Sequence, residues 1–393
     1  MQSKTKYYEE KETKYIEAKC NVCNKKRDFA EVDEKKEYTR GRPRKKAHWI
    51  CNSCKRKIKR KELWEKVKGF MQASRIQTAP FAAAVIYMAY LSGLDKQMWL
   101  NIILPFLGGL VHMVGCIHNS IIDTVMGYDT KDSNKVHGYT TGVLDAKKHK
   151  KMINWIILVF AVILSIIGFF GANNILSLLG IIFLVVGGYV YNNISKQTYF
   201  GFIPIGVSYA GMVLYGFSLS HSTVLLIDLF PLIIYVMAVT MIQIAFWGEL
   251  KDIEYDEKSL VKKLGVKLVN NYLTITKKFD IMYFTFRALS LSPLIVYMVL
   301  THDPNHIIQT VHLSFWMFVF VLIAFWLNTK IFQFKEWNRR KIFLYINFSE
   351  FLFIFLMFPF FIKWWMVFVI LPVSVGLWIG LNKLLWDDYV QKT

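Results

Sequence analysis

Acidic and amide side chains gather at two places in an otherwise apolar chain, and their spacing points to chemistry. They are Asn119, Asp123, Asp129 and Asp132 in the first group, and Glu249, Asp252 and Asp256 in the second. In each group two members lie four residues apart, so on a helix they share one face. Two such faces turned toward each other would form a cage of oxygen atoms. This donor set suits Mg²⁺ bridging a diphosphate better than it suits zinc or a redox metal.

Each group also has a simpler explanation, because acidic residues at helix ends are often only solvated loop charges. For one group alone this explanation would be as good as the chemical one. A carboxylate beside a bilayer is costly, however, and is usually retained for ion or substrate chemistry. Two groups with the same four-residue step therefore favour a shared site.

The elements that must position these groups are long apolar segments. Of the 393 residues, 54% are hydrophobic and 16% are aromatic, a more apolar composition than that of a soluble protein. Stretches long enough to cross a bilayer, about 20 residues, lie at 76–94, 97–119, 152–172, 174–194, 200–220, 223–248, 280–300, 309–328, 342–362 and 365–386. The sequence predicts an all-α polytopic membrane protein, a bundle of nine to ten transmembrane helices. The number stays open because the break at 361–365 is short.

The formal charge of +20 has a distribution that indicates topology rather than nucleic-acid binding. Basic residues concentrate at 131–151, 251–267 and 330–341, whereas the intervening loops contain a single lysine, Lys96. By the positive-inside rule, the basic loops, the N-terminus and both acidic groups are cytoplasmic. The first 70 residues are strongly charged and show no cleavable signal peptide. We expect a multi-pass protein of the cell membrane.

A polar, lysine-rich region precedes the membrane segments and contains two CxxC pairs, Cys20 with Cys23 and Cys51 with Cys54. The 27 residues between the pairs, and a reducing cytoplasm, favour a structural zinc site with four thiolates. A redox dithiol and an iron–sulfur site are the alternatives. Strand-like pieces at 27–32 and 47–50 fit a zinc ribbon. We expect a zinc-ribbon-like β domain at 1–60, a basic interfacial linker helix at 61–75 and the transmembrane domain at 76–393.

The segment from Arg40 to Lys46, with the sequence RGRPRKK, is similar to the core of an AT-hook, which binds the DNA minor groove. The match is short. A basic loop beside a membrane is attracted to anionic head groups, which explains the same residues more simply. We therefore expect lipid or protein-partner contact here, and nucleic-acid binding is disfavoured.

The order of the motifs resembles the UbiA superfamily of intramembrane prenyltransferases, over about residues 70–390. That family carries an Asn/Asp motif after its second helix and an Asp-xxx-Asp motif after its sixth, followed by a basic stretch and Leu-Gly. The corresponding segments here are 118–132 and 249–258, followed by Leu264 and Gly265. The segments 75–80 (RIQTAP) and 191–196 (YNNISK) are similar to the family's first-helix start and its Tyr/Lys segment.

The resemblance implies roles for individual residues. It implies catalytic and Mg²⁺-binding roles for Asn119, Asp123, Asp252 and Asp256, with metal binding extended to Asp129 and, less directly, to Asp132. It implies that substrate is bound by Arg75, Lys131, Lys135, Tyr191 and Lys196.

The chain departs from the family pattern at three positions. Ser120 and Gly127 stand where the family often has Asp, and His137 stands in place of a common Arg. The ten-residue step from Asn119 to Asp129 is instead similar to the menaquinone-pathway branch. If the missing Arg contacts diphosphate, Lys131 or Lys135 takes its place, or the substrate differs.

The expected function is Mg²⁺-dependent transfer of a polyprenyl group from its diphosphate to an aromatic quinone precursor at the cytoplasmic side. A glycerol-phosphate lipid acceptor, of the geranylgeranylglyceryl phosphate type, is the first alternative. A cation-coupled transporter and a regulatory protein with a partner-binding zinc domain are further alternatives. The transporter predicts acids at mid-membrane, whereas these acids lie at one face.

Several other residues have structural interpretations. We expect His112 and His118 to be hydrogen bonders between helices and Cys116 to be a packing residue. The pairs at 108–109 and 187–188, both Gly-Gly, are expected to permit close helix approach.

Overall fold

The structure is a computed structural model of the chain. It describes residues 7–10, 13–19, 26–30, 52–91, 97–129, 137–172, 175–220, 226–253, 259–270, 272–300, 307–332, 345–346, 349, 352–353 and 364–386. The chain divides into two units, Met1–Lys68 and Gly69–Thr393, which are described separately.

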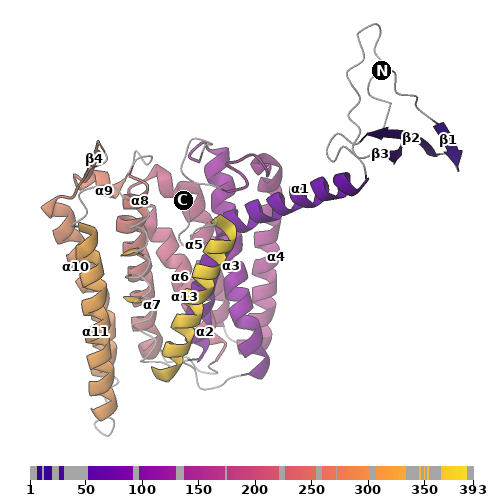
Figure 1. Cartoon of the computed structure of the whole chain (residues 1–393). Coiled ribbons are helices and arrows are strands. Elements are labelled where there is room, and N and C mark those ends of the chain that lie inside the picture. The colour runs from indigo at the N-terminus through magenta and orange to yellow at the C-terminus, as the bar shows by residue number, and fades with distance from the viewer. Residues whose placement is uncertain are drawn as a thin grey trace. The chain divides into compact units, whose positions relative to one another are not determined.

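The first unit contains a three-stranded antiparallel sheet with strand order β1-β2-β3 (Figure 1). The strands are β1 (Tyr7–Glu10), β2 (Thr13–Lys19) and β3 (Lys26–Ala30). The predicted strand at 27–32 overlaps β3, whereas β1 and β2 were not anticipated from the sequence. The predicted strand at 47–50 lies outside the described residues.

The predicted zinc ligands are largely outside the described part of the chain. Cys20, Cys23 and Cys51 are not among the described residues, and Cys54 lies in the first turn of α1 (Asn52–Ala73) with its side chain undescribed. The zinc site therefore stays a prediction. The helix α1 overlaps the segment 61–75 of the predicted linker helix but begins earlier, at Asn52, and the predicted domain boundaries stay a prediction.

The second unit is a bundle of long helices (Figure 1). They are α2 (Ala79–Leu91), α3 (Met98–Val125), α4 (Ala146–Ala172), α5 (Ile175–Ile194), α6 (Phe202–Ser218), α7 (Leu226–Ile242), α10 (Lys277–Leu300), α11 (Ile307–Phe332) and α13 (Trp364–Trp386). The short elements are η2 (Ile76–Thr78), η3 (Ser195–Gln197), the π-helical η4 (Gln243–Gly248), α8 (Glu249–Lys251), α9 (Leu260–Lys263), β4 (Lys267–Val269) and β5 (Tyr272–Thr274).

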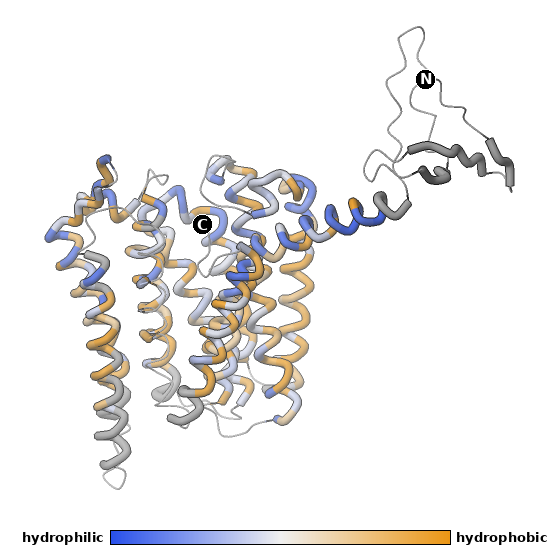
Figure 2. The backbone as a smooth tube through the Cα atoms, in the orientation of Figure 1, coloured by the Kyte–Doolittle hydropathy of each residue, from blue (hydrophilic) through white to orange (hydrophobic). Residues whose placement is uncertain are grey.

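Five helices in the described part are long and apolar enough to cross a membrane. Figure 2 shows hydrophobic residues along the middle of the helices and hydrophilic residues toward the end that holds α8 and α9. Large apolar side chains such as Phe106 and Phe170 are exposed, as expected for a surface that faces lipid. The structure thus confirms the helical membrane bundle. The count of nine or ten stays a prediction, because most of 342–362 lies outside the described residues.

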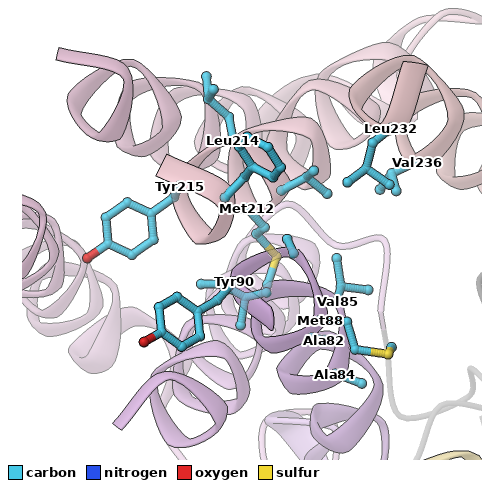
Figure 3. Close-up of a cluster of buried hydrophobic side chains, with 14 of the residues drawn as sticks. Ala82, Ala84, Val85, Met88, Tyr90, Met212, Leu214, Tyr215, Leu232 and Val236 are labelled. Carbon is cyan, nitrogen blue, oxygen red and sulfur yellow. The ribbon is translucent and has the colours of Figure 1, made fainter. Parts of the chain in front are cut away.

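Two predicted spans, α2 and α6, are short helices of 13 and 17 residues, and α7 also has 17 residues but continues directly into η4. Both α2 and α6 lie in the centre of the core, and Figure 3 shows the side chains of α2, α6 and α7 that meet there. Tyr90 of α2, Tyr215 of α6 and Leu232 of α7 are almost completely buried. Because neighbouring helices cover these segments, their apolar character serves protein packing as well as the lipid environment.

One glycine of each predicted Gly-Gly pair lies at a close helix contact. A Cβ on Gly108 would lie 2.4 Å from Cγ2 of Ile86, and one on Gly187 would lie 2.7 Å from the carbonyl oxygen of Pro204. The first contact joins α3 to α2, and the second joins α5 to α6. Such small residues let helix backbones approach in a membrane, where packing replaces hydrophobic burial as the main driving force.

Candidate active site

The first acidic group begins on the last turns of α3. Asn119 and Asp123 share one face, and Nδ2 of Asn119 donates a hydrogen bond of 3.0 Å to Oδ2 of Asp123. Asp123 is buried, with 2% exposure. The four-residue spacing therefore produces the paired side chains that it predicted.

A tight helix end brings Asp129 back to this face. Gly127 has φ +80°, and the amide of Tyr128 donates to the carbonyl of Asp123 while that of Gly127 donates to Thr124. These two bonds form a Schellman motif, which favours glycine at the left-handed position. The amide of Asp129 also donates to the carbonyl of Asp123, at 3.1 Å. The helix end thus explains how Asp129, ten residues after Asn119, belongs to the same cluster as Asn119 and Asp123.

A lysine from another helix end completes the cluster. Nζ of Lys196 in η3 lies 3.2 Å from Oδ2 of Asp123 and 3.6 Å from Oδ1 of Asp129. The ammonium also lies 5.2 Å from the ring centroid of Tyr128. The chain just after η3 packs tightly against the start of η3, since a Cβ on Gly201 would lie 2.2 Å from the carbonyl oxygen of Ser195. Lys196, predicted to bind substrate, is therefore held against the predicted metal ligands.

His137 joins the same cluster and was not predicted to do so. Its Nε2 lies 3.5 Å from Oδ2 of Asp129. Thr140 fixes the loop, since its Oγ1 donates to the carbonyl of His137 and accepts from the amide of His137. Nearby, burial raises the pKa of Tyr139 to about 12, and its hydroxyl lies 3.2 Å from Nδ1 of His149. In the sequence, His137 was singled out because it stands in place of an Arg that is common in the family. The sequence did not indicate that His137 pairs with Asp129.

The second acidic group contains one carboxylate, Glu249, that holds two short helices together. Oε2 of Glu249 accepts hydrogen bonds from Oγ of Ser259 and the amide of Val261, so this carboxylate ties α8 to the start of α9. Asp252 follows α8 and is buried, with 7% exposure. Asp256 lies outside the described residues, as do Lys131, Asp132 and Lys135 of the first loop.

A cavity of about 290 Å³ lies among the helices beside the first acidic group. Asn119 lines it, and so do Arg75 and Tyr191, both predicted to bind substrate. Trp247 and Gly248, directly before Glu249, line it from η4. The chain segments that carry the two acidic groups therefore border one cavity. Most of the remaining wall is apolar, as expected of a site for an isoprenoid tail.

The two histidines of α3 also line this cavity and bond to neighbouring helices, as predicted. Nδ2 of Asn192 donates to the carbonyl of Gly115 and lies 2.9 Å from Nδ1 of His118. An amide NH₂ only donates, so Nδ1 of His118 accepts and Nε2 carries the proton. His112 lies within hydrogen-bond distance of Thr78 in η2 and Tyr209 in α6. Cys116, expected only to pack, has its sulfur 3.5 Å from Nε2 of His112.

The first group has the chemistry of a cation site. Asn119, Asp123 and Asp129 supply hard oxygen donors of the kind that Mg²⁺ takes, and the ammonium of Lys196 bridges the two carboxylates as a cation would. In the described part of the chain, no group of three or more His, Cys, Asp or Glu residues is arranged to hold a metal by itself. The donor types fit Mg²⁺, with Lys196 now pairing with the carboxylates.

The fold and the site define a helical membrane protein with an internal cavity and a buried acidic cluster beside it. Residues 78–341 match the UbiA prenyltransferase family. The chain therefore belongs to the UbiA prenyltransferase family, and its class is that of a prenyltransferase. The predicted family and enzyme class are confirmed. A search of curated proteins finds no match.

Solved structures of UbiA homologues have a similar fold. One from Archaeoglobus fulgidus, described as bound to GPP and Mg²⁺, has a TM-score of 0.51 and 10% identity, over 77% of this chain and 99% of that chain. The apo structure of a homologue from Aeropyrum pernix K1 has a TM-score of 0.49 and 13% identity, over 77% and 96% of the two chains. At this identity the first likeness concerns the fold alone.

Proposed function

We propose that this protein transfers a polyprenyl group from its diphosphate to an aromatic quinone-precursor acceptor, in a Mg²⁺-dependent reaction at the cytoplasmic face. The observation that carries the proposal is the buried cluster of Asn119, Asp123, Asp129 and Lys196 beside a largely apolar cavity. The A. fulgidus homologue described as bound to GPP and Mg²⁺ supports the same donor and ion.

The carboxylates and the amide would hold the ion, together with Asp252 and Asp256 from the second group. Bound Mg²⁺ supplies Lewis-acid stabilisation of the diphosphate oxygens. In the structure, the ammonium of Lys196 forms ion pairs with Asp123 and Asp129. If those carboxylates held a cation instead, the ammonium of Lys196 would be free to face the diphosphate, where positive charge would stabilise the leaving group as the carbon–oxygen bond breaks.

The cavity wall would serve the other end of the donor. Apolar side chains would exclude water from the isoprenoid, and Tyr189, Tyr191 and Trp247 line the same space. Aromatic rings can stabilise an adjacent allylic cation by a cation–π interaction. Arg75 at the cavity adds a second positive charge for the diphosphate. Attack by acceptor carbon and attack by acceptor oxygen both fit, so a glycerol-phosphate lipid is the alternative acceptor.

The test uses membranes that contain the full chain, radiolabelled geranylgeranyl diphosphate, Mg²⁺ and two acceptors, a dihydroxynaphthoate and a glycerol phosphate. We expect prenyl transfer to the aromatic acceptor and a loss of about 10²-fold or more in Asp123→Asn and Asp252→Asn. Asp145→Asn is the matched control, because Asp145 is exposed and its capping bond to the amide of Lys148 survives as Asn. Unchanged activity in both site variants, or no transfer to either acceptor, would refute the proposal.

We also propose that Cys20, Cys23, Cys51 and Cys54 bind one structural zinc. Four thiolates close the coordination sphere, so the site would shape the N-terminal domain without taking part in catalysis. Metal analysis of the purified full chain should give about one zinc per chain, and the double variant Cys20→Ser with Cys23→Ser should lose it. Wild-type protein with a zinc content far below one would rule this out.

A further inference from the structure

A chain of three polar side chains crosses the cavity wall on the side formed by η2, α3 and α6. Oη of Tyr209 lies 3.3 Å from Nδ1 of His112, and Nε2 of His112 lies 2.8 Å from Oγ1 of Thr78. Oγ1 of Thr78 lies 2.8 Å from the carbonyl oxygen of Arg75. All three side chains line the cavity and are half-buried, and none was predicted from the sequence to act on the substrate.

The backbone carbonyl at one end of this chain fixes the direction of each hydrogen bond in it. The carbonyl of Arg75 can only accept, so the hydroxyl of Thr78 donates to it. The oxygen of Thr78 then accepts from Nε2–H of His112, which leaves Nδ1 without a proton. Nδ1 therefore accepts from the hydroxyl of Tyr209. The oxygen of Tyr209 has no other hydrogen-bond partner among the described residues, so its lone pairs remain for a ligand in the cavity.

We propose that Tyr209 accepts the hydroxyl proton of the prenyl acceptor and passes its own proton to His112. The inference rests on the proposed prenyl transfer and assigns the acceptor to compounds with a reactive O–H, a phenol, enol or alcohol. A ligand carbonyl could not pair with Tyr209, because both would offer only lone pairs. Tyr209 and His112 thus select a hydrogen-bond donor and prepare it as a nucleophile.

The carbon–oxygen bond of the donor breaks and its electron pair leaves with the diphosphate, while the acceptor oxygen or its conjugated ring carbon forms the new bond to C1. The acceptor proton moves to Oη of Tyr209 as the proton of Tyr209 moves to Nδ1 of His112, which becomes an imidazolium. The other titratable groups that line the cavity are Arg75, Cys116, His118, Tyr189 and Tyr191. His112 returns the proton to water as the products leave.

Three variants of the full chain test the relay. Tyr209→Phe removes the group that touches the acceptor. His112→Gln keeps one hydrogen-bond donor and one acceptor but cannot hold an extra proton, so it separates proton transfer from positioning. Tyr215→Phe is the matched control on the same helix, since its hydroxyl donates to the carbonyl of Leu164 and does not line the cavity.

Two rates are measured with geranylgeranyl diphosphate and Mg²⁺. One is hydrolysis of the diphosphate without acceptor, and the other is transfer to a dihydroxynaphthoate or to its O-methyl ether. We expect Tyr209→Phe and His112→Gln to lower the transfer rate about 10²-fold while acceptor-free hydrolysis stays within about twofold of wild type. The O-methyl ether should react poorly with wild type and show no further loss in Tyr209→Phe.

The outcomes separate this inference from the proposed function. Transfer at the wild-type rate in Tyr209→Phe would overturn the relay, and the same result in His112→Gln alone would overturn the role of His112 as the proton acceptor. An equal loss of hydrolysis and transfer in both variants would also overturn it, because the residues would then serve donor binding. If wild-type protein neither hydrolyses the diphosphate nor transfers the prenyl group, the proposed function itself fails.

Discussion

Replacement of Lys196 by Met should destabilise the protein in the absence of divalent cations and much less in their presence. At an effective dielectric constant of about 20, an ammonium attracts a carboxylate by about 5 kcal/mol at the separations of 3.2 Å and 3.6 Å seen for Asp123 and Asp129. Desolvation of the ammonium offsets part of this attraction. Removal of one partner from a buried ion pair typically costs about 3–5 kcal/mol, because the remaining charge is left uncompensated.

The assay is thermal unfolding of detergent-solubilised protein in EDTA and in Mg²⁺. For a large domain, about 2–4 °C of Tm corresponds to 1 kcal/mol, so we expect Lys196→Met to unfold roughly 6–10 °C or more below wild type in EDTA. Mg²⁺ should raise the Tm of the variant more than that of wild type, since the ion replaces the missing charge. Lys147→Met, which removes an exposed lysine at the start of α4, is the control and should leave Tm unchanged. A Tm of Lys196→Met equal to wild type in EDTA, or equal responses to Mg²⁺, would refute the reasoning.

Three further predictions concern packing, pH and the helix end. Gly211→Ala should lower stability by about 1–3 kcal/mol in denaturant unfolding, because its Cβ would lie 2.4 Å from the amide nitrogen of Leu184; Gly376→Ala, with no atom within 4 Å of its Cβ, should be neutral or slightly stabilising. Since burial raises the pKa of Tyr139 to about 12, the unfolded chain loses this proton first, so stability should fall as pH rises from about 10 to 12. Tyr139→Phe should flatten that alkaline decline. Gly127→Ala should cost about 1 kcal/mol at φ +80° and weaken Mg²⁺ binding more than Gly376→Ala does, as measured by Mg²⁺-dependent Tm.

Local features of the site could be predicted from the sequence. The step from Asn119 to Asp123 is one helical turn, and the structure joins these side chains by a hydrogen bond. His112 and His118 were also expected to form hydrogen bonds between helices, because a polar ring on an apolar helix needs a partner. These predictions needed only contacts within one helix or the certainty that a buried polar group is paired.

Contacts between distant segments could not be predicted in the same way. Glu249 was grouped with Asp252 because both are acidic and near in sequence, yet its carboxylate bonds Ser259 and Val261. The link of Tyr209 to His112 spans 97 residues and depends on how α6 packs on α3. Such pairs follow from helix packing angles and close glycine contacts, which the hydrophobic pattern does not fix.

The departures from the family pattern become understandable through the geometry of α3. Ser120, where an Asp is common, is buried and its hydroxyl donates to the carbonyl of Ala73, so a charge there would be desolvated within a helix contact. Gly127, where a second Asp is common, holds the left-handed turn. That turn returns Asp129 to Asp123, and Lys196 pairs with both. Gly127 thus forms the turn that places Asp129 in the same cluster as Asp123. The position of Asp129 therefore depends on Gly127. A Gly127→Asp substitution would disturb the turn that places Asp129 beside Asp123 and Lys196.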